Sequence, residues 1–188
     1  MVALMKGKRF NDHKHKLTYH VGVDLKYDEV RCHVKVFEER KSFIPVPARV
    51  EFWSYAGKPL HNMDEFDGVF LEANRITGYT EFDCGFEVNS SFNDTYRWVR
   101  SSRGLPADLK KATWKFWLFD LPESVYEYRF RRSAMAMVCT AASDWYLPGS
   151  LVMPEHHVCH TEQQVDDLFL SVIERGIEGL MVKTFDHK

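Results

Sequence analysis

The sequence predicts an α+β domain whose strands are mainly antiparallel. A chain of 188 residues is long enough for one domain with a real core and too short for two large ones. Hydrophobic residues make up 45% of the chain and aromatic residues 14%, which indicates a folded globule and not a disordered segment. Strand-like runs and segments with helical spacing both occur along the chain, and such a mixture is typical of this class.

The expected strands are short runs rich in Val, Leu, Tyr and other residues that favour extended backbone. The most aromatic run contains Trp114, Phe116, Trp117 and Phe119, and Pro122 stops it. In chain order, the expected strands are residues 18–26, 31–37, 50–55, 79–88, 113–121 and 179–182.

The expected helices are residues 64–77, 129–142 and 162–175. Gly78 closes the first of them. The last has the clearest signals, because Thr161 and Gln164 fit a capping box and Gly176 ends the pattern. Its apolar face consists of Val165, Leu168, Phe169, Val172 and Ile173.

Along the chain we expect a polar basic arm over residues 1–17 and one domain over residues 18–188. The formal net charge is −2, so no global basic field indicates a nucleic-acid partner. Two local stretches are basic, however, and each could meet a phosphate backbone or form a solvated face. The first comprises Lys6, Lys8, Arg9, His13, Lys14, His15 and Lys16. The second comprises Arg97, Arg100, Arg103, Lys110 and Lys111.

Cysteine usage and hydropathy indicate a reduced, cytoplasmic environment. The four cysteines do not have the pattern of a disulfide framework. No apolar run approaches the ~20 residues that a membrane span needs. The apolar residues 2–5 are too few for the core of a signal peptide. We therefore expect a cytoplasmic protein with no membrane partner.

Two charged motifs near opposite ends of the chain indicate an enzyme. The first is K-x-D-x-x-R, with Lys26, Asp28 and Arg31, and the second is E-G-L-M-V-K, from Glu178 to Lys183. A nucleophilic lysine needs desolvation or a neighbouring cation to lose its proton, and phosphate chemistry needs carboxylates and cations. Alone, the first motif fits an exposed strand edge with a salt bridge, and the second fits an ordinary junction between a helix and a strand. The presence of both motifs, in this order and with an aromatic strand between them, favours an enzyme site.

With these motifs the chain resembles the nucleotidyltransferase (adenylation) domain of ATP-dependent DNA ligases, especially the small bacteriophage enzymes. K-Y-D-E-V-R is similar to their lysine motif K-x-D-G-x-R, and E-G-L-M-V-K to their fourth motif. Looser similarities are found at residues 54–58 (S-R-x-G-K), 82–95 (D-G-E, then F-N) and 116–121 (the aromatic motif), and the resemblance spans about residues 20 to 185.

The resemblance implies a nucleotidyltransferase fold with mainly antiparallel sheets flanked by helices. It also implies ATP and Mg²⁺ as cofactors and a monomer that acts on nicked duplex DNA, in the host cytoplasm if a phage encodes the protein. In such a reaction a lysine attacks the α-phosphate of ATP and releases pyrophosphate. The AMP then passes to the 5′-phosphate at a nick, and the 3′-hydroxyl displaces AMP and seals the strand during DNA replication or repair.

The resemblance further assigns roles to single residues. Lys26 would be the nucleophile, and Asp24 and Leu25 before it would bind the nucleotide, Asp24 by contacting the adenine amino group. Arg31 would hold the ribose or a DNA phosphate. Phe119 would stack on adenine, although it could instead be a plain core residue, with Trp117 as the other candidate for stacking.

Carboxylates and a second lysine complete the implied site. Glu87 and Glu178 would bind ribose or Mg²⁺, because a cation gives a physical reason for two neighbouring buried carboxylates. Lys183 would neutralise phosphate charge and help to depress the pKa of Lys26, unless it is an exposed strand residue.

Several positions depart from the family pattern. Glu29 replaces the glycine beside the nucleophile, and Tyr55 replaces an arginine. The D-G-E triplet is not intact, so either Asp83 or Glu87 could be its acid, with Glu87 favoured by its spacing. The chain ends before the tryptophan-and-lysine strand and the OB-type domain of the family, so we expect a C-terminally truncated domain.

These departures leave two other functions open. One is a degenerate module that binds nucleotide or DNA without catalysis, and the other is a relative such as an RNA ligase or a capping guanylyltransferase. The glutamate of E-G-L-M-V-K favours a ligase over a capping enzyme. Residues 156–160 (H-H-V-C-H) are expected to form a polar loop, because no second ligand pair for zinc accompanies them.

Overall fold

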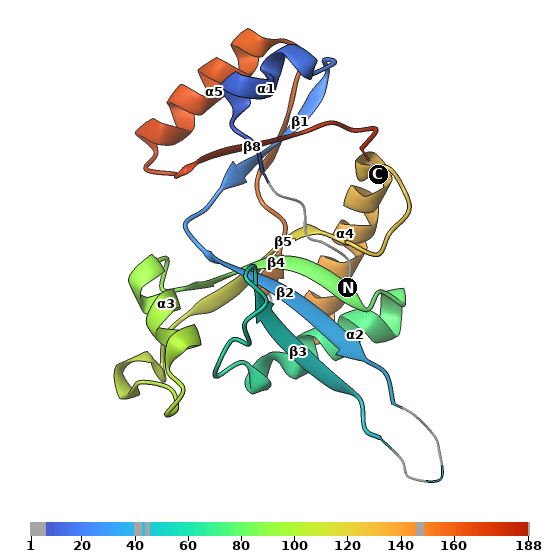
Figure 1. Ribbon diagram of the computed structural model, residues 1–188, viewed down its shortest axis with the longest axis vertical. Coiled ribbons are helices and arrows are strands. Elements are labelled where there is room, and N and C mark those ends of the chain that lie inside the picture. The colour runs from blue at the N-terminus through green and yellow to red at the C-terminus, as the bar shows by residue number, and fades with distance from the viewer. Residues whose placement is uncertain (1–6, 40–42, 44–45, 146–148, 188) are drawn as a thin grey trace.

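The computed structural model describes residues 7–39, 43, 46–145 and 149–187. The strands within these residues are β1 (Val21–Lys26), β2 (Val30–Phe37), β3 (Arg49–Ser54), β4 (Glu81–Val88), β5 (Trp114–Asp120), β6 (Leu151–Val152), β7 (His156–Cys159) and β8 (Gly179–Lys183). They form a three-stranded sheet, β7-β1-β8, and a five-stranded sheet, β3-β2-β4-β5-β6. Every neighbouring pair is antiparallel except β5 and β6. The chain passes directly from one sheet to the other between β1 and β2 (Figure 1).

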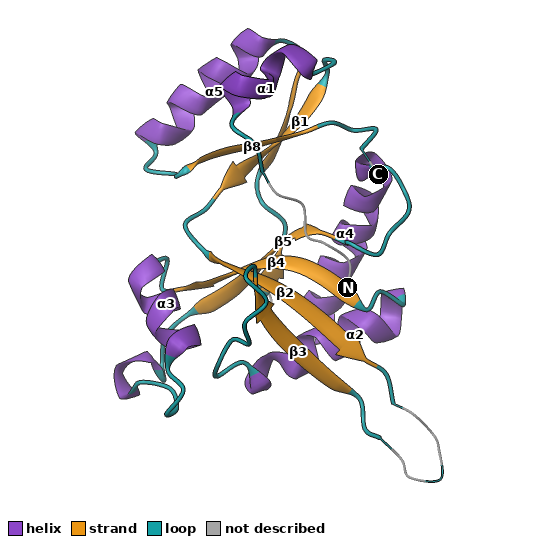
Figure 2. Cartoon of the chain, in the orientation of Figure 1, coloured by secondary structure: helices purple, strands orange, loops and turns teal. Residues whose placement is uncertain are grey.

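Helices flank both sheets (Figure 2). They are α1 (Phe10–His13), α2 (Asp67–Thr77), α3 (Phe92–Arg100), α4 (Tyr128–Trp145) and α5 (Glu162–Glu174), with 3-10 turns at Lys14–Lys16, Asp64–Phe66 and Ala107–Leu109. Helices α1 and α5 lie against the three-stranded sheet, and α2 and α4 lie against the five-stranded sheet. The mixed class with mainly antiparallel strands is confirmed.

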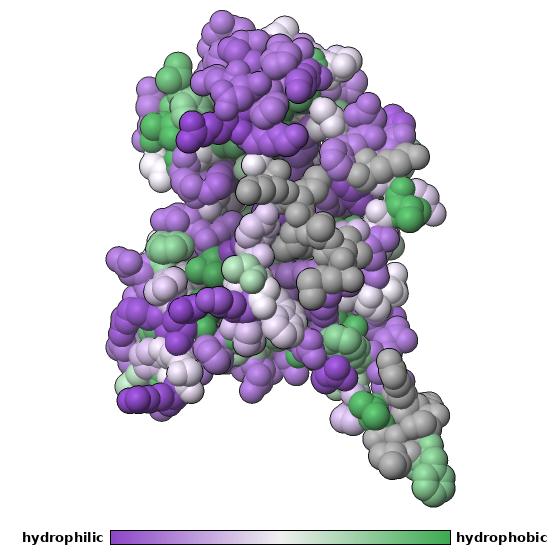
Figure 3. Space-filling model, in the orientation of Figure 1, coloured by the Kyte–Doolittle hydropathy of each residue, from purple (hydrophilic) through white to green (hydrophobic). Residues whose placement is uncertain are grey.

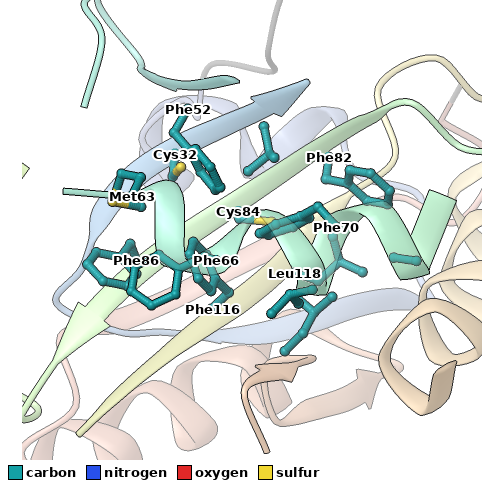
Figure 4. Close-up of a cluster of buried hydrophobic side chains, with 14 of the residues drawn as sticks. Cys32, Phe52, Met63, Phe66, Phe70, Phe82, Cys84, Phe86, Phe116 and Leu118 are labelled. Atoms are coloured by element: carbon teal, nitrogen blue, oxygen red, sulfur yellow. The ribbon is translucent and has the colours of Figure 1, made fainter. Parts of the chain in front are cut away.

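The main core fills the space between the five-stranded sheet and α2 with α4 (Figure 4). Successive side chains of a strand point to opposite faces, so Phe82, Cys84 and Phe86 of β4 all enter this core. Phe116 of β5 meets Phe70 of α2 edge to face, with ring centroids 5.0 Å apart. Each fully buried aromatic ring stabilises the fold by about 1.5–3 kcal/mol. The alternate residues of the same strands are therefore left on the other face of the sheet.

A second, smaller core lies under the three-stranded sheet. Val21 and Val23 of β1 pack with Val165 of α5. Phe10 and Leu17, both within the expected polar arm, also pack against this cluster. Residues 10–16 accordingly form α1 and a 3-10 turn.

The expected strands and helices are present, with ends displaced by a few residues. Helix α3 was not expected from the sequence, although Ser91 caps it by accepting a hydrogen bond from the backbone N–H of Asp94. The expected polar loop at residues 156–160 is wrong. His156–Cys159 forms β7, because its backbone pairs with β1 and places Cys159 in the small core.

The surface shown in Figure 3 is mainly hydrophilic, with scattered hydrophobic patches. None of the helices in the described part of the chain is long and apolar enough to cross a membrane. The four cysteines, Cys32, Cys84, Cys139 and Cys159, are free thiols.

Candidate functional site

A cavity of about 490 Å³ lies where the two sheets approach each other. This volume is within the usual range for small-molecule sites. Strands β1 and β8, the outer face of the five-stranded sheet and the first turn of α4 all contribute to its wall. The lining residues are Gly7, Lys8, Leu17, Asp24, Leu25, Lys26, Glu29, Arg31, Asp83, Phe119, Asp120, Tyr128, Arg131, Met181, Val182, Lys183, Thr184 and His187. The cavity thus contains Lys26 and five of the other predicted site residues: Asp24, Leu25, Arg31, Phe119 and Lys183.

Lys26 ends β1, and its backbone is opposite Gly179 of β8. Glu178 directly precedes β8, so pairing of the two strands brings the two predicted motifs together. The Lys26 Nζ forms an ion pair with the Glu178 carboxylate, and both side chains are partly exposed at the edge of the cavity. The next residue, Tyr27, stacks on Trp117 of β5 with ring centroids 3.9 Å apart. This stack ties the turn after Lys26 to the five-stranded sheet.

The cavity floor is the outer face of the five-stranded sheet. Phe119 of β5 is half-buried and lines the cavity, whereas Trp117 is covered by Tyr27. Arg31 donates from Nε to the Asp83 Oδ1 at 2.5 Å and pairs its other arm with Oδ2, and its guanidinium lies 5.6 Å from the centre of the Phe119 ring. An aromatic face beside a held guanidinium suits a flat, anionic ligand such as a nucleotide.

Gly85 leaves room on this floor for two neighbouring side chains. A Cβ atom there would come within 2.8 Å of the Phe119 ring and even closer to the Glu29 Cγ. Glu29 therefore extends from the β1–β2 turn across Gly85 into the cavity. Burial raises the pKa of Glu29 to about 7. The positive charges of Lys26 and Arg31 lower this pKa, and the negative charges of Glu178 and Asp83 raise it by smaller amounts.

Replacing Glu29 with glutamine is expected to stabilise the fold above pH 7. A carboxyl whose pKa is raised on folding binds more protons in the folded state, so its contribution to stability is lost as pH rises from about 4.5 to about 7. Glutamine has no such loss, and we expect the variant to gain on the order of 2 kcal/mol over the wild type between pH 4 and pH 8. Urea unfolding at both pH values measures this. An equal difference at both pH values would contradict the shifted pKa.

Asp24 is a buried carboxylate whose oxygens are fully engaged. Its Oδ1 accepts from His156 at 2.6 Å and from Arg132 at 3.2 Å, and its Oδ2 accepts from Tyr128 at 2.8 Å and pairs with Lys183 at 2.9 Å. Burial by itself would raise the pKa of Asp24, but His156, Lys183 and Tyr128 hold it well below its usual range. In this arrangement Asp24 joins β1 to α4, β7 and β8.

Lys183 is likewise held inside the wall of the cavity. Its Nζ donates to the backbone carbonyl of Phe119 at 2.9 Å in addition to its pair with Asp24. Burial would lower the pKa of Lys183, but the Asp24 carboxylate outweighs burial and raises it. Lys183 therefore carries a full charge next to the cavity, and it would have to leave Asp24 to reach a phosphate.

The N-terminal part of α4 supplies site residues that the sequence did not reveal. Tyr128 and Arg132 bind Asp24, and the chain after β8 fixes the start of the helix. The carbonyls of His187 and Phe185 accept the backbone N–H groups of Tyr128 and Arg129 at 2.7 and 3.1 Å. Helical spacing predicts α4 itself, but no local pattern shows that its first turn faces β1.

Two predicted carboxylates do not line the cavity. Glu87 on β4 accepts from the Trp117 indole N–H at 2.8 Å and from Ser90 at 3.0 Å. Glu178 is engaged by Lys26, so the two acids share no partner. In the described part of the chain no group of three or more His, Cys, Asp or Glu side chains could hold a metal ion. The two-carboxylate Mg²⁺ site stays a prediction, and Asp83 is the acid of the D-G-E region that lines the cavity.

Comparison with known proteins relates the fold to solved structures. No protein-family model matches the chain, and no curated protein matches it in sequence. Structural similarity is clear: the bacteriophage T7 ATP-dependent DNA ligase in complex with ATP aligns with a TM-score of 0.66 at 14% identity. The Chlorella virus DNA ligase-adenylate aligns with 0.63 at 14% identity, and a structure named Pmar-Lig_PreS3 with 0.66 at 21% identity. The chain has the nucleotidyltransferase fold of DNA ligase adenylation domains.

The alignments cover 90%, 93% and 94% of this chain, and 60%, 58% and 41% of the respective solved chains. The chain therefore spans about half the length of the structures it matches. The nucleotidyltransferase fold predicted from the two motifs is confirmed. Because a Chlorella virus ligase and a phage ligase align about equally well, the comparison does not single out the bacteriophage type.

Proposed function

We propose that residues 18–188 are an adenylation domain of an ATP-dependent DNA ligase, which forms a covalent lysyl-AMP on Lys26. The observation that carries this proposal is the position of Lys26 at the edge of a cavity whose floor is the Phe119 ring beside Arg31. Support also comes from the solved structures with this fold, two of which are named as a ligase-adenylate and as a ligase in complex with ATP.

The proposed transfer uses the Lys26 amine as the nucleophile. Lys26 first passes its proton to the paired Glu178 carboxylate or to water. The neutral Nζ then attacks the α-phosphorus of ATP, a P–N bond forms, the bond to the β-phosphate oxygen breaks, and pyrophosphate leaves. The adenine would stack on Phe119, and Arg31 would hold the ribose or a phosphate. AMP would then pass to a 5′-phosphate at a nick, where the 3′-hydroxyl displaces it.

We propose Mg²⁺ only as the companion ion of the triphosphate. Glu87 and Glu178 are held by different partners in this structure, so no step is assigned to a metal held by the protein. Glu178 is the carboxylate nearest to the nucleophile that could contact such an ion once Lys26 has been modified.

Incubation with ATP labelled at the α-phosphate tests the proposal. We expect label to remain on the protein through denaturing electrophoresis, and we expect pyrophosphate to reverse the transfer. ATP binding without stable label would overturn it and would favour the second candidate, a binding module without catalysis. The observation that favours this second candidate is Glu29, whose carboxyl stands near Lys26 at the position where the family has a glycine.

Nicked duplex DNA is the proposed partner, and helix α3 offers a surface for it. Phe92 and Tyr96 are exposed and stack on each other, and the Arg100 guanidinium lies 5.7 Å from the Tyr96 ring. Arg97 is neutralised by Asp94 and Asp108. The exposed cations left on this surface are Arg100, Arg103, Lys110 and Lys111.

Replacing Arg100 and Arg103 together with glutamine is expected to weaken binding to nicked duplex DNA. Each lost phosphate contact reduces the slope of log K against log salt by about 0.9, so the double variant should lose about two units of slope. Fluorescence anisotropy over a salt series measures this. The control is Arg75→Gln, which removes an exposed arginine on α2 that is paired with Glu72. An unchanged slope would show that DNA binds elsewhere.

A further inference from the structure

Four carboxylates line the cavity, and three of them are already paired. Asp83 is held by Arg31, Asp120 by Arg131, and Asp24 by its four partners. Within the described residues, no hydrogen bond or ion pair holds the carboxylate of Glu29. Glu29 is therefore the one lining acid in this part of the chain whose acceptor oxygens are open to a ligand.

The position of Glu29 limits which part of a nucleotide it can meet. Its side chain crosses Gly85 next to the Phe119 ring, so a base stacked on that ring would bring its sugar or its edge close to the carboxylate. Phosphate groups carry only acceptors and negative charge, and a carboxylate repels them. Ribose hydroxyls are donors without charge, and a glutamate or aspartate is a common acceptor for them in nucleotide sites.

We propose that Glu29 accepts a hydrogen bond from a ribose hydroxyl of the nucleotide and so selects ribonucleotides over deoxyribonucleotides. The proposal rests on the proposed nucleotide site and names a determinant of its specificity. Glu29 reaches the sugar from the β1–β2 turn across Gly85, whereas Phe86, the next residue of β4, faces the core and Glu87 is held by Trp117. The open carboxylate thus comes from the turn and not from β4.

Calorimetric titration of the full chain with ATP, 2′-deoxy-ATP and 3′-deoxy-ATP at pH 8 tests this. Loss of a hydrogen bond to a charged group typically weakens binding by about tenfold or more. We expect the wild type to bind at least one deoxy analogue about tenfold more weakly than ATP. Glu29→Ala should bind ATP as weakly as that analogue, and Glu29→Gln, which keeps a carbonyl acceptor, should retain part of the preference.

Glu174→Ala is the matched control, since it removes an exposed glutamate at the end of α5, away from the cavity. It should keep the full preference for ATP. Equal binding of all three nucleotides to the wild type, or an unchanged preference in Glu29→Ala, would overturn the inference and leave the proposed function intact. Failure of every nucleotide to bind would overturn the proposed function itself. Thermal unfolding of each variant confirms that differences in affinity do not come from loss of fold.

Discussion

Replacing Lys26 with arginine is expected to abolish transfer of AMP to the protein. Arginine keeps the positive charge and can keep the pair with Glu178, so the turn after β1 should retain its structure. A guanidinium does not lose its proton at any pH at which the protein is folded, and it cannot supply the lone pair that attacks the α-phosphorus. Label from α-labelled ATP should fall below detection, while noncovalent ATP binding, measured by calorimetry, should change little.

The matched control for Lys26→Arg is the same substitution at a lysine outside the site. Lys16 is exposed beside α1 and does not line the cavity. Lys16→Arg should transfer AMP at the wild-type rate. Label that persists in Lys26→Arg would mean that another residue carries the nucleotide.

Replacing Asp24 with alanine is expected to lower the free energy of unfolding by about 3–5 kcal/mol, the usual effect of removing one partner from a buried charge pair. The Lys183 side chain is largely buried and would keep its charge with the Phe119 carbonyl as its one remaining acceptor among the described residues. Tyr128 and Arg132 would lose their acceptor at the same time. Urea unfolding at pH 7 measures the effect. Asp166→Ala, an exposed aspartate on α5, should change stability by less than about 0.5 kcal/mol.

The loss at Asp24 should depend on pH in a defined direction. A carboxyl whose pKa is lowered on folding contributes stability above its unfolded pKa of about 3.9 and loses it as pH falls towards the folded pKa. The difference between the wild type and Asp24→Ala should therefore be complete at pH 7 and smaller at pH 3. A difference that grows on acidification would contradict the network described here.

The elements that could be predicted from the sequence are those with strong local patterns. The aromatic strand β5 and the capped helix α5 carry their own periodicity and end signals, and both lie where expected. Strand β7 has a polar sequence, and only its pairing with β1 makes it a strand. Helix α3 buries Thr95, Trp98 and Val99 on one face at helical spacing and is capped by Ser91, so the sequence carries signals for this helix that the expected elements left out.

In the site, too, the features with a local sequence pattern could be predicted, and those that depend on tertiary contacts could not. The meeting of Lys26 with Glu178 could be anticipated from two motifs, because each lies at the end of a strand and the two strands are neighbours. The partners of Asp24 come from α4, β7 and β8, and no sequence pattern links them. The choice of Glu87 over Asp83 relied on spacing along the chain. In the structure both acids lie on the outer face of β4 and differ in their partners, because Glu87 accepts from Trp117 whereas Asp83 joins Arg31 in the cavity.

The most direct test of the central claim is to locate AMP on the chain. After incubation with ATP and Mg²⁺, the intact protein should gain the mass of one AMP, and peptide mapping at neutral pH, where a P–N bond survives, should place it on the peptide that contains Lys26. The same treatment of Lys26→Arg should give no adduct. An adduct on another lysine, such as Lys183, or no adduct on a folded protein that binds ATP, would contradict the account.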